Sequence, residues 1–183
     1  LEYIEPELRE MTGEIEAARK NKLPQLIAYS DLKGDLQTQT SWTDGEHSIE
    51  EMADAALALG LEYIAITDHT VSLAMTGGSD EKKLRRQMVA IDALNEKYKK
   101  AKKKIRILKG AEVNIMKDGS LDIADSVLKD LDVVGAAVHT NFTMTEDEMT
   151  RRIVRAMENK HVDILFHPTG RIIQKREPYA LNI

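Results

Sequence analysis

Residues 34–45 read GDLQTQTSWTDG. This stretch predicts a short strand over residues 32–38, followed at once by a loop that ends in Asp44 and Gly45. Side chains along a strand alternate between its two faces, so we expect Gln37 and Gln39 to point to the same side. Polar residues at the carboxyl end of a strand, on the loop into a helix, are how barrels and open α/β sheets present site residues.

The strand–loop–helix pattern repeats along the rest of the chain. The segments SIEE at 48–51 and TEDE at 145–148 are capping boxes, each of which predicts the start of a helix. Apolar residues at helical spacing predict further helices through residues 84–98 and 123–131 and place Met149, Ile153 and Met157 on one buried stripe. Further strands are predicted over residues 62–67, 105–113, 133–138 and 163–166. This alternation predicts a parallel sheet with helices outside it.

The composition is that of an ordinary globular protein. The 183 residues suffice for one domain, or one domain with a tail, and 42% hydrophobic with 31% charged residues is typical. The net charge of −5 gives no overall attraction to nucleic acid, so any DNA contact must be local. The absence of cysteine excludes thiolate metal sites and agrees with a reducing compartment, so we expect a cytoplasmic protein. No apolar run approaches the roughly 20 residues that span a bilayer.

Side chains that bind metals follow the ends of the predicted strands. The carboxyl ends of parallel strands converge on one rim, so residues far apart in the sequence are expected around one pocket. Imidazole and carboxylate groups without thiolates suit Zn²⁺, Mn²⁺ or Fe²⁺. The pattern therefore predicts a divalent metal site. The residues of this rim are Gln37, Gln39, Asp44, His69, Glu112, His139 and His167.

Several short motifs resemble, in order, those of the polymerase and histidinol phosphatase (PHP) domain. DLQTQT with WTDG resembles the first motif, in which the two glutamine positions are normally histidine. TDH at 67–69, GAE at 110–112, VH at 138–139 and FHPTGR at 166–171 resemble the later ones. PELRE and GEIEAA, within residues 1–30, are similar to the junction that follows the polymerase part of bacterial and archaeal family X DNA polymerases. The chain thus resembles the PHP domain of such a polymerase.

The resemblance implies the architecture and the domain limits. PHP domains are α/β proteins, with a distorted TIM-like barrel of seven βα units. We expect about five units here, with residues 1–30 as a linker or arm after a polymerase domain and residues 31–183 as a PHP domain. A final Asp-x-His pair of the family has no counterpart before Ile183, so we expect the last part of the domain to be missing.

The resemblance also implies the roles of the metal ligands. PHP domains hold up to three metal ions. Glu112 would bridge the first and second ions, and His139 and His167 would complete the second site. Asp44 and His69 would serve the third ion.

The two glutamines depart from the family pattern. Gln37 and Gln39 stand at positions that normally bind the first ion, and an amide oxygen is a weaker, neutral ligand. We therefore expect fewer than three bound ions, with Mn²⁺, Zn²⁺ or Mg²⁺ as the cofactor.

By resemblance, the function is that of a metal-dependent phosphoesterase that removes nucleotides from DNA 3′ ends, with weakened activity. Glu112 and His139 are the expected catalytic residues, and Arg171 is the expected phosphate contact. The expected partners are DNA and a nucleotidyltransferase domain of the same chain.

Two alternatives stay open, a degenerate PHP domain that acts as a scaffold and a phosphomonoesterase of the histidinol phosphatase type. The basic run KYKKAKKKIR at 97–106 is either a solvated helix end or a contact for DNA phosphates.

Overall fold

A computed structural model describes residues 1–172 and 174–182 and divides the chain into two compact units, Leu1–Leu32 and Lys33–Ile183. The first unit contains one short α-helix, α1 (Glu14–Arg19), between two 3₁₀ turns, η1 (Pro6–Leu8) and η2 (Tyr29–Asp31). Gly13 precedes α1 with a φ of 104°, a left-handed conformation that glycine adopts without strain.

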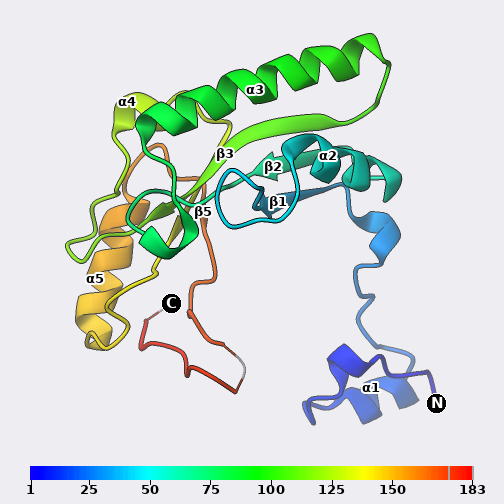
Figure 1. The fold of residues 1–183 in the computed structure, drawn as a ribbon. Coiled ribbons are helices and arrows are strands. Elements are labelled where there is room, and N and C mark those ends of the chain that lie inside the picture. Colours follow the sequence, from blue (N-terminus) through cyan, green and yellow to red (C-terminus); the bar gives the residue numbers. More distant parts are fainter. Residues whose placement is uncertain (173, 183) are drawn as a thin grey trace. The chain divides into compact units, whose positions relative to one another are not determined.

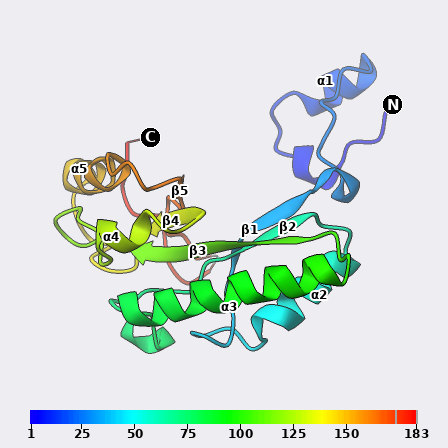
Figure 2. The same ribbon diagram turned by 90° about the horizontal axis from the view of Figure 1, so that it is seen from above.

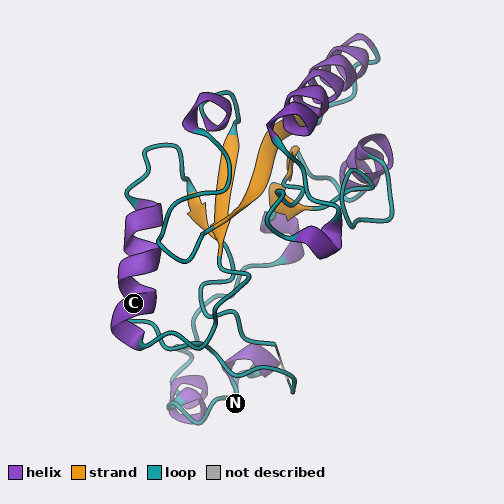
Figure 3. Ribbon diagram, turned by 60° about the vertical axis from the view of Figure 1, so that its left-hand side comes forward, coloured by secondary structure: helices purple, strands orange, loops and turns teal. Residues whose placement is uncertain are grey.

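The second unit is built on a sheet of five parallel strands in sequence order (Figure 1). The strands are β1 (Gly34–Thr38), β2 (Tyr63–Ile66), β3 (Arg106–Asn114), β4 (Val133–Ala137) and β5 (Ile164–Leu165). The sheet curls into a half-barrel (Figure 3), and a register shift between Asp35 and Thr38 interrupts the pairing of β1 with β2. The predicted α/β class with a barrel-like parallel sheet is confirmed.

Helices connect the strands, and two of them begin at the two predicted capping boxes. They are α2 (Ile49–Ala58), α3 (Glu81–Lys100), α4 (Asp125–Leu128) and α5 (Glu146–Met157), with a 3₁₀ turn η3 (Ala74–Thr76) before α3. The capping boxes at Ser48 and Thr145 are both formed, and Asp80 caps α3. In the described part of the chain, no helix has the length and apolar character needed to cross a membrane.

Two details of the predicted helices are wrong. The helix expected over residues 123–131 is a single turn, so Ile123 is buried in the core from a position before α4. Met157 is 36% exposed because it is the last residue of α5, beyond the buried stripe that Met149 and Ile153 form.

The core lies between the helices and one face of the sheet, in two clusters. In Figure 2, α3 runs along β3, and α2 packs against β2. Ile64, Ile66 and Ile107 fill the cluster under α2 and α3, while Ala111 and Val113 belong to the cluster under α4 and α5. Because side chains alternate along β3, the neighbours of these residues, Glu112 among them, face the inside of the half-barrel.

The close packing of Gly135 on β4 gives a test of this arrangement. A Cβ atom at Gly135 would lie 2.1 Å from Cε2 of Phe166, the residue that precedes His167. Gly135→Ala should therefore lower the free energy of unfolding by about 1–3 kcal/mol through overpacking. Urea denaturation checks this. Adding Phe166→Leu should restore part of the loss, and an equal loss in the double variant would contradict the packing explanation.

Candidate metal centre

A buried carboxylate, that of Glu112 on β3, forms the centre of the site. Only 1% of Glu112 is exposed, and both carboxylate oxygens are surrounded by polar atoms. Oε1 lies 3.0 Å from Nε2 of His139 and 2.7 Å from Nε2 of His167. Oε2 accepts hydrogen bonds from the side-chain amides of Gln37 and Gln39, each at 3.0 Å. The ends of four strands therefore meet at one side chain.

These contacts keep the carboxylate charged. Burial by itself would raise the pKa of Glu112 because it penalises the ionised form. Hydrogen bonds from His139, His167 and Gln37, together with the charge of His69, outweigh burial and hold the pKa well below its usual range. The site thus carries a negative charge at neutral pH, at a depth where water does not screen it.

Three imidazoles lie around this carboxylate. The ring centroids of His69 and His139 are 5.4 Å apart, and those of His139 and His167 are 5.2 Å apart. Ligand atoms of His69, Glu112 and His139 all lie within 4.8 Å of one another. Imidazole nitrogens around an ionised carboxylate are the donors that divalent transition metals prefer, so the residues fit such an ion.

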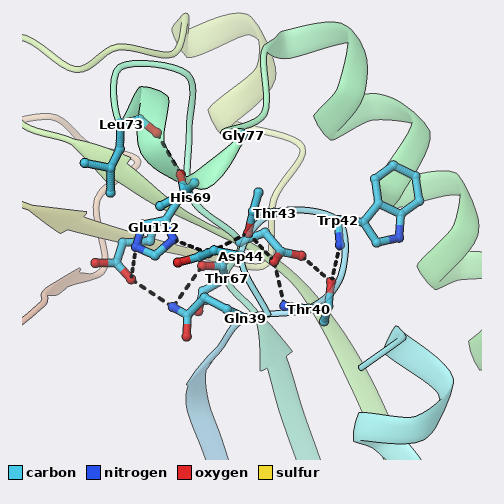
Figure 4. Close-up of polar contacts among 12 residues, drawn as sticks. Gln39, Thr40, Trp42, Thr43, Asp44, Thr67, His69, Leu73, Gly77 and Glu112 are labelled. Carbon is cyan, nitrogen blue, oxygen red and sulfur yellow. Dashed lines mark hydrogen bonds and ion pairs between the residues drawn. The ribbon is translucent and has the colours of Figure 1, made fainter. Parts of the chain in front are cut away.

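His69 is oriented by the loop that follows β1. Its Nδ1 atom lies 2.9 Å from Oδ1 of Asp44, and its Nε2 atom lies 3.7 Å from Oε2 of Glu112 (Figure 4). Partial burial favours a higher pKa for Asp44, but the hydrogen bond and the charge of His69 lower it. Asp44 is thus a carboxylate that holds the ring of His69 from the solvent side.

A second carboxylate, Asp68, holds that loop and was not among the predicted site residues. It is fully buried and accepts hydrogen bonds from the backbone N–H of Thr40 at 2.7 Å and from the hydroxyl of Thr43 at 2.7 Å. The amide of Gln87, from α3, also donates to it. The signal in the sequence was the position of Asp68 directly before His69 at a strand end.

Asn114 is a second residue that the sequence analysis missed. It lies two positions beyond Glu112 on β3, and its Oδ1 atom is 2.7 Å from Nδ1 of His139. The period of two along a strand is the signal that would have placed it on the site face.

Arg171 does not join the cluster. Its side chain is exposed and makes no hydrogen bond or ion pair within residues 1–172 and 174–182. It follows His167 on the loop after β5, where His167 itself has a φ of 31°, a strained conformation for a residue other than glycine.

The basic run lies at the other end of the sheet. Lys97 pairs with Glu50 at 2.6 Å, and Lys103 pairs with Asp54. The run leads into the start of β3, whereas Glu112 lies near its end, about 20 Å along the strand at roughly 3.3 Å per residue. These lysines therefore do not line the metal cluster.

Comparison with known proteins finds similarity over the whole chain. Residues 35–176 match the protein family described as PHP domain. The chain is 42% identical over 183 residues to "DNA polymerase/3'-5' exonuclease PolX" of Bacillus subtilis (strain 168), which covers 100% of this chain and 31% of that protein. It is 35% identical over 140 residues to a probable phosphatase of Thermoanaerobacter sp. (strain X514) and 33% identical over 138 residues to one of Acetivibrio thermocellus.

The chain spans only part of each of these relatives. It covers 31% of the Bacillus protein and 53% of each of the two probable phosphatases. Each of those two matches covers 73% of this chain.

The contacts of Asp68 predict that it stabilises the loop beneath Asp44. Asp68→Ala leaves the buried N–H of Thr40 and the amide of Gln87 without an acceptor, and each such group costs about 1–3 kcal/mol. We expect the free energy of unfolding to fall by about 3 kcal/mol or more, measured by urea denaturation. Asp92→Ala, which removes an exposed carboxylate paired with Lys109, should cost less than about 0.5 kcal/mol. Similar losses in both variants would contradict this role.

Proposed function

This chain belongs to the PHP domain family, and we propose on that premise that it is the metal-dependent phosphoesterase domain of a DNA polymerase, acting as a 3′–5′ exonuclease. The observation that carries the proposal is the buried, ionised Glu112 with three imidazoles beside it. The similarity to a protein named as polymerase and exonuclease, which extends over all 183 residues, favours DNA as the substrate.

The proposed ligands divide between the two oxygens of Glu112. His139 and His167 would hold an ion beside Oε1, to which both are hydrogen-bonding neighbours. His69, with Asp44 behind it, would hold an ion on the Oε2 side. A bound divalent ion supplies an activated water and neutralises phosphoryl charge, the two requirements of phosphodiester hydrolysis.

The protein residues have their own tasks in this proposal. Glu112 and His139 are the proposed catalytic residues because they fix the charge and the ligand geometry at the reacting phosphate. Arg171 is the proposed phosphate contact, since its guanidinium is exposed on the loop that carries His167 and can form two parallel hydrogen bonds to phosphate oxygens.

We further propose that fewer than three ions bind. Gln37 and Gln39 each donate an N–H to Oε2 of Glu112, so neutral amides satisfy the oxygen that would bridge to a first ion. An amide oxygen is a weak ligand for Zn²⁺ and a better one for Mn²⁺ or Mg²⁺. The proposed activity is correspondingly weaker than that of a site with histidine at both positions.

Residues 1–30 are proposed to be the linker from a nucleotidyltransferase domain, which would be the partner of this domain within one protein. The match to the Bacillus protein includes this segment, because it covers 100% of the chain. The matches to the two probable phosphatases cover 73% of the chain, which makes a phosphomonoesterase of the histidinol phosphatase type the weaker alternative.

One observation favours a scaffold without hydrolysis as a second candidate. Four neighbours already satisfy both oxygens of Glu112, so the half-barrel is held together at this point without any ion. Such a network would allow the domain to keep its fold after losing its chemistry.

Replacing Glu112 separates the two candidates. Glu112→Gln removes the charge at the centre of the site, so Mn²⁺ binding measured by calorimetry should be lost. Release of nucleotides from a labelled DNA 3′ end should fall by at least about 100-fold, the scale on which loss of a transition-state charge contact acts. Glu62→Gln, at an exposed carboxylate paired with Lys33, should change neither quantity. A wild-type protein that binds no Mn²⁺ and leaves DNA intact would favour the scaffold.

Restoring histidine tests the proposed role of the two amides. The double variant Gln37→His/Gln39→His exchanges N–H donors for imidazole nitrogens beside Oε2 of Glu112. It should bind at least one more equivalent of Mn²⁺ than the wild type, counted by elemental analysis after gel filtration. Gln25→His/Gln174→His, which adds two imidazoles at exposed positions, is the matched control. An unchanged metal content in the first variant would refute the substitution argument.

A further inference from the structure

Behind His139 lies a second buried polar group, Asn114. Asn114 is 4% exposed and shares the inner face of β3 with Glu112, two residues before it. Its Oδ1 atom lies 2.7 Å from Nδ1 of His139, on the side of the ring away from Glu112. The ring of His139 is therefore held between an amide and a carboxylate.

The partners of Asn114 assign the orientation of its amide. Nδ2 lies 2.7 Å from Oδ2 of Asp122 and 2.9 Å from the hydroxyl oxygen of Thr70. An ionised carboxylate can only accept hydrogen bonds, so the NH₂ group must face Asp122 and the oxygen must face His139. That oxygen accepts from Nδ1, which places a ring proton of His139 on Nδ1.

Asp122 is itself held in place. Its carboxylate accepts hydrogen bonds from the backbone N–H groups of Asn114 at 2.9 Å and Ser72 at 3.0 Å, and from the hydroxyl of Thr70 at 2.8 Å. An antiparallel bridge between Ile115 and Leu121 turns the chain back so that Asp122 returns beside Asn114. The amide of Asn114 thus has one available orientation.

The contact with Asn114 also determines what the other ring nitrogen of His139, Nε2, faces. With Nδ1 donating to Asn114, Nε2 is the ring nitrogen that faces Oε1 of Glu112, 3.0 Å away. Histidine ligands of metals usually donate their second ring N–H to a carboxylate or carbonyl oxygen, which sets the tautomer and the ring direction. Asp44 contacts His69 directly in the same way. At His139, the amide of Asn114 lies between the ring and the carboxylate of Asp122.

We propose that Asn114 and Asp122 are positioning residues of the metal centre. They hold the Nδ1 proton of His139 and so direct Nε2 toward the ion. This role rests on the proposed function, because His139 is taken as a ligand. Neither residue touches the ion or the substrate. A purely structural role, in which the two residues only tie β3 to the segment around Thr70, would leave the tautomer of His139 unaffected.

The central test is Asn114→Leu, which keeps the branching of the side chain at Cγ and removes the acceptor. In the metal-free wild type, NMR of ¹⁵N-labelled histidine should show a slowly exchanging Nδ1–H proton for His139. The variant should lose this signal, and its dissociation constant for Mn²⁺ should rise by about 10–100-fold, the usual effect of losing the group behind a metal-bound histidine.

An exchange of the two side chains keeps the test decisive if Asn114→Leu does not fold. In Asn114→Asp/Asp122→Asn, the new carboxylate at 114 accepts from Nδ1 of His139 and the new amide at 122 donates to it, with the net charge unchanged. This double variant should keep both the Nδ1–H signal and the wild-type Mn²⁺ affinity. Loss of either would overturn the proposal.

Asn95→Leu is the matched control. Asn95 makes two hydrogen bonds to the backbone of Ile107, away from the metal centre, so its loss should lower stability without changing the His139 signal or Mn²⁺ affinity. Retention of the Nδ1–H signal or of the Mn²⁺ affinity in Asn114→Leu would refute the positioning role. If the wild type binds no Mn²⁺, the proposed function fails, and the NMR comparison alone still decides whether Asn114 orients the ring.

Discussion

The carboxylate of Glu112 is 1% exposed, and an ionised carboxylate at that depth is stable only when hydrogen-bond donors surround it. The donors lie at the ends of β1 and β4 and beyond β5, with His69 following β2. The strands that carry these donors must therefore end level with Glu112, and the parallel register of the sheet aligns their ends in this way. The buried charge of Glu112 is therefore stable only because the curl of the sheet brings these strand ends together.

Two further carboxylates, Asp68 and Asp122, lie behind the rim and organise the loops that carry its side chains. Asp68 fixes the loop that presents Asp44, and Asp122 fixes the amide that contacts His139. Both accept several backbone and side-chain donors, so their side chains have little freedom. The side chains of such a site have fixed positions before any ion binds, so binding would cost less conformational entropy.

Gln37 and Gln39 form hydrogen bonds on the Oε2 side of Glu112 only. An imidazole can offer a lone pair to a cation, whereas the amide N–H groups of Gln37 and Gln39 satisfy Oε2 as donors. The His139 and His167 side keeps the nitrogen donors that suit transition metals. One half of the rim therefore presents imidazole nitrogens, and the other half is a network of amide hydrogen bonds.

The sequence predicts the α/β class, the parallel strands, the starts of α2 and α5 and the residues of the rim, because these features depend on local periodicity, capping and the ends of the strands. It did not reveal Asp68, Asn114 or Asp122 as partners of the rim residues. The tertiary structure decided these points because hydrogen bonds such as that between Asn114 and His139 join residues 25 positions apart. Only the curl of the sheet determines which atoms of such distant side chains meet.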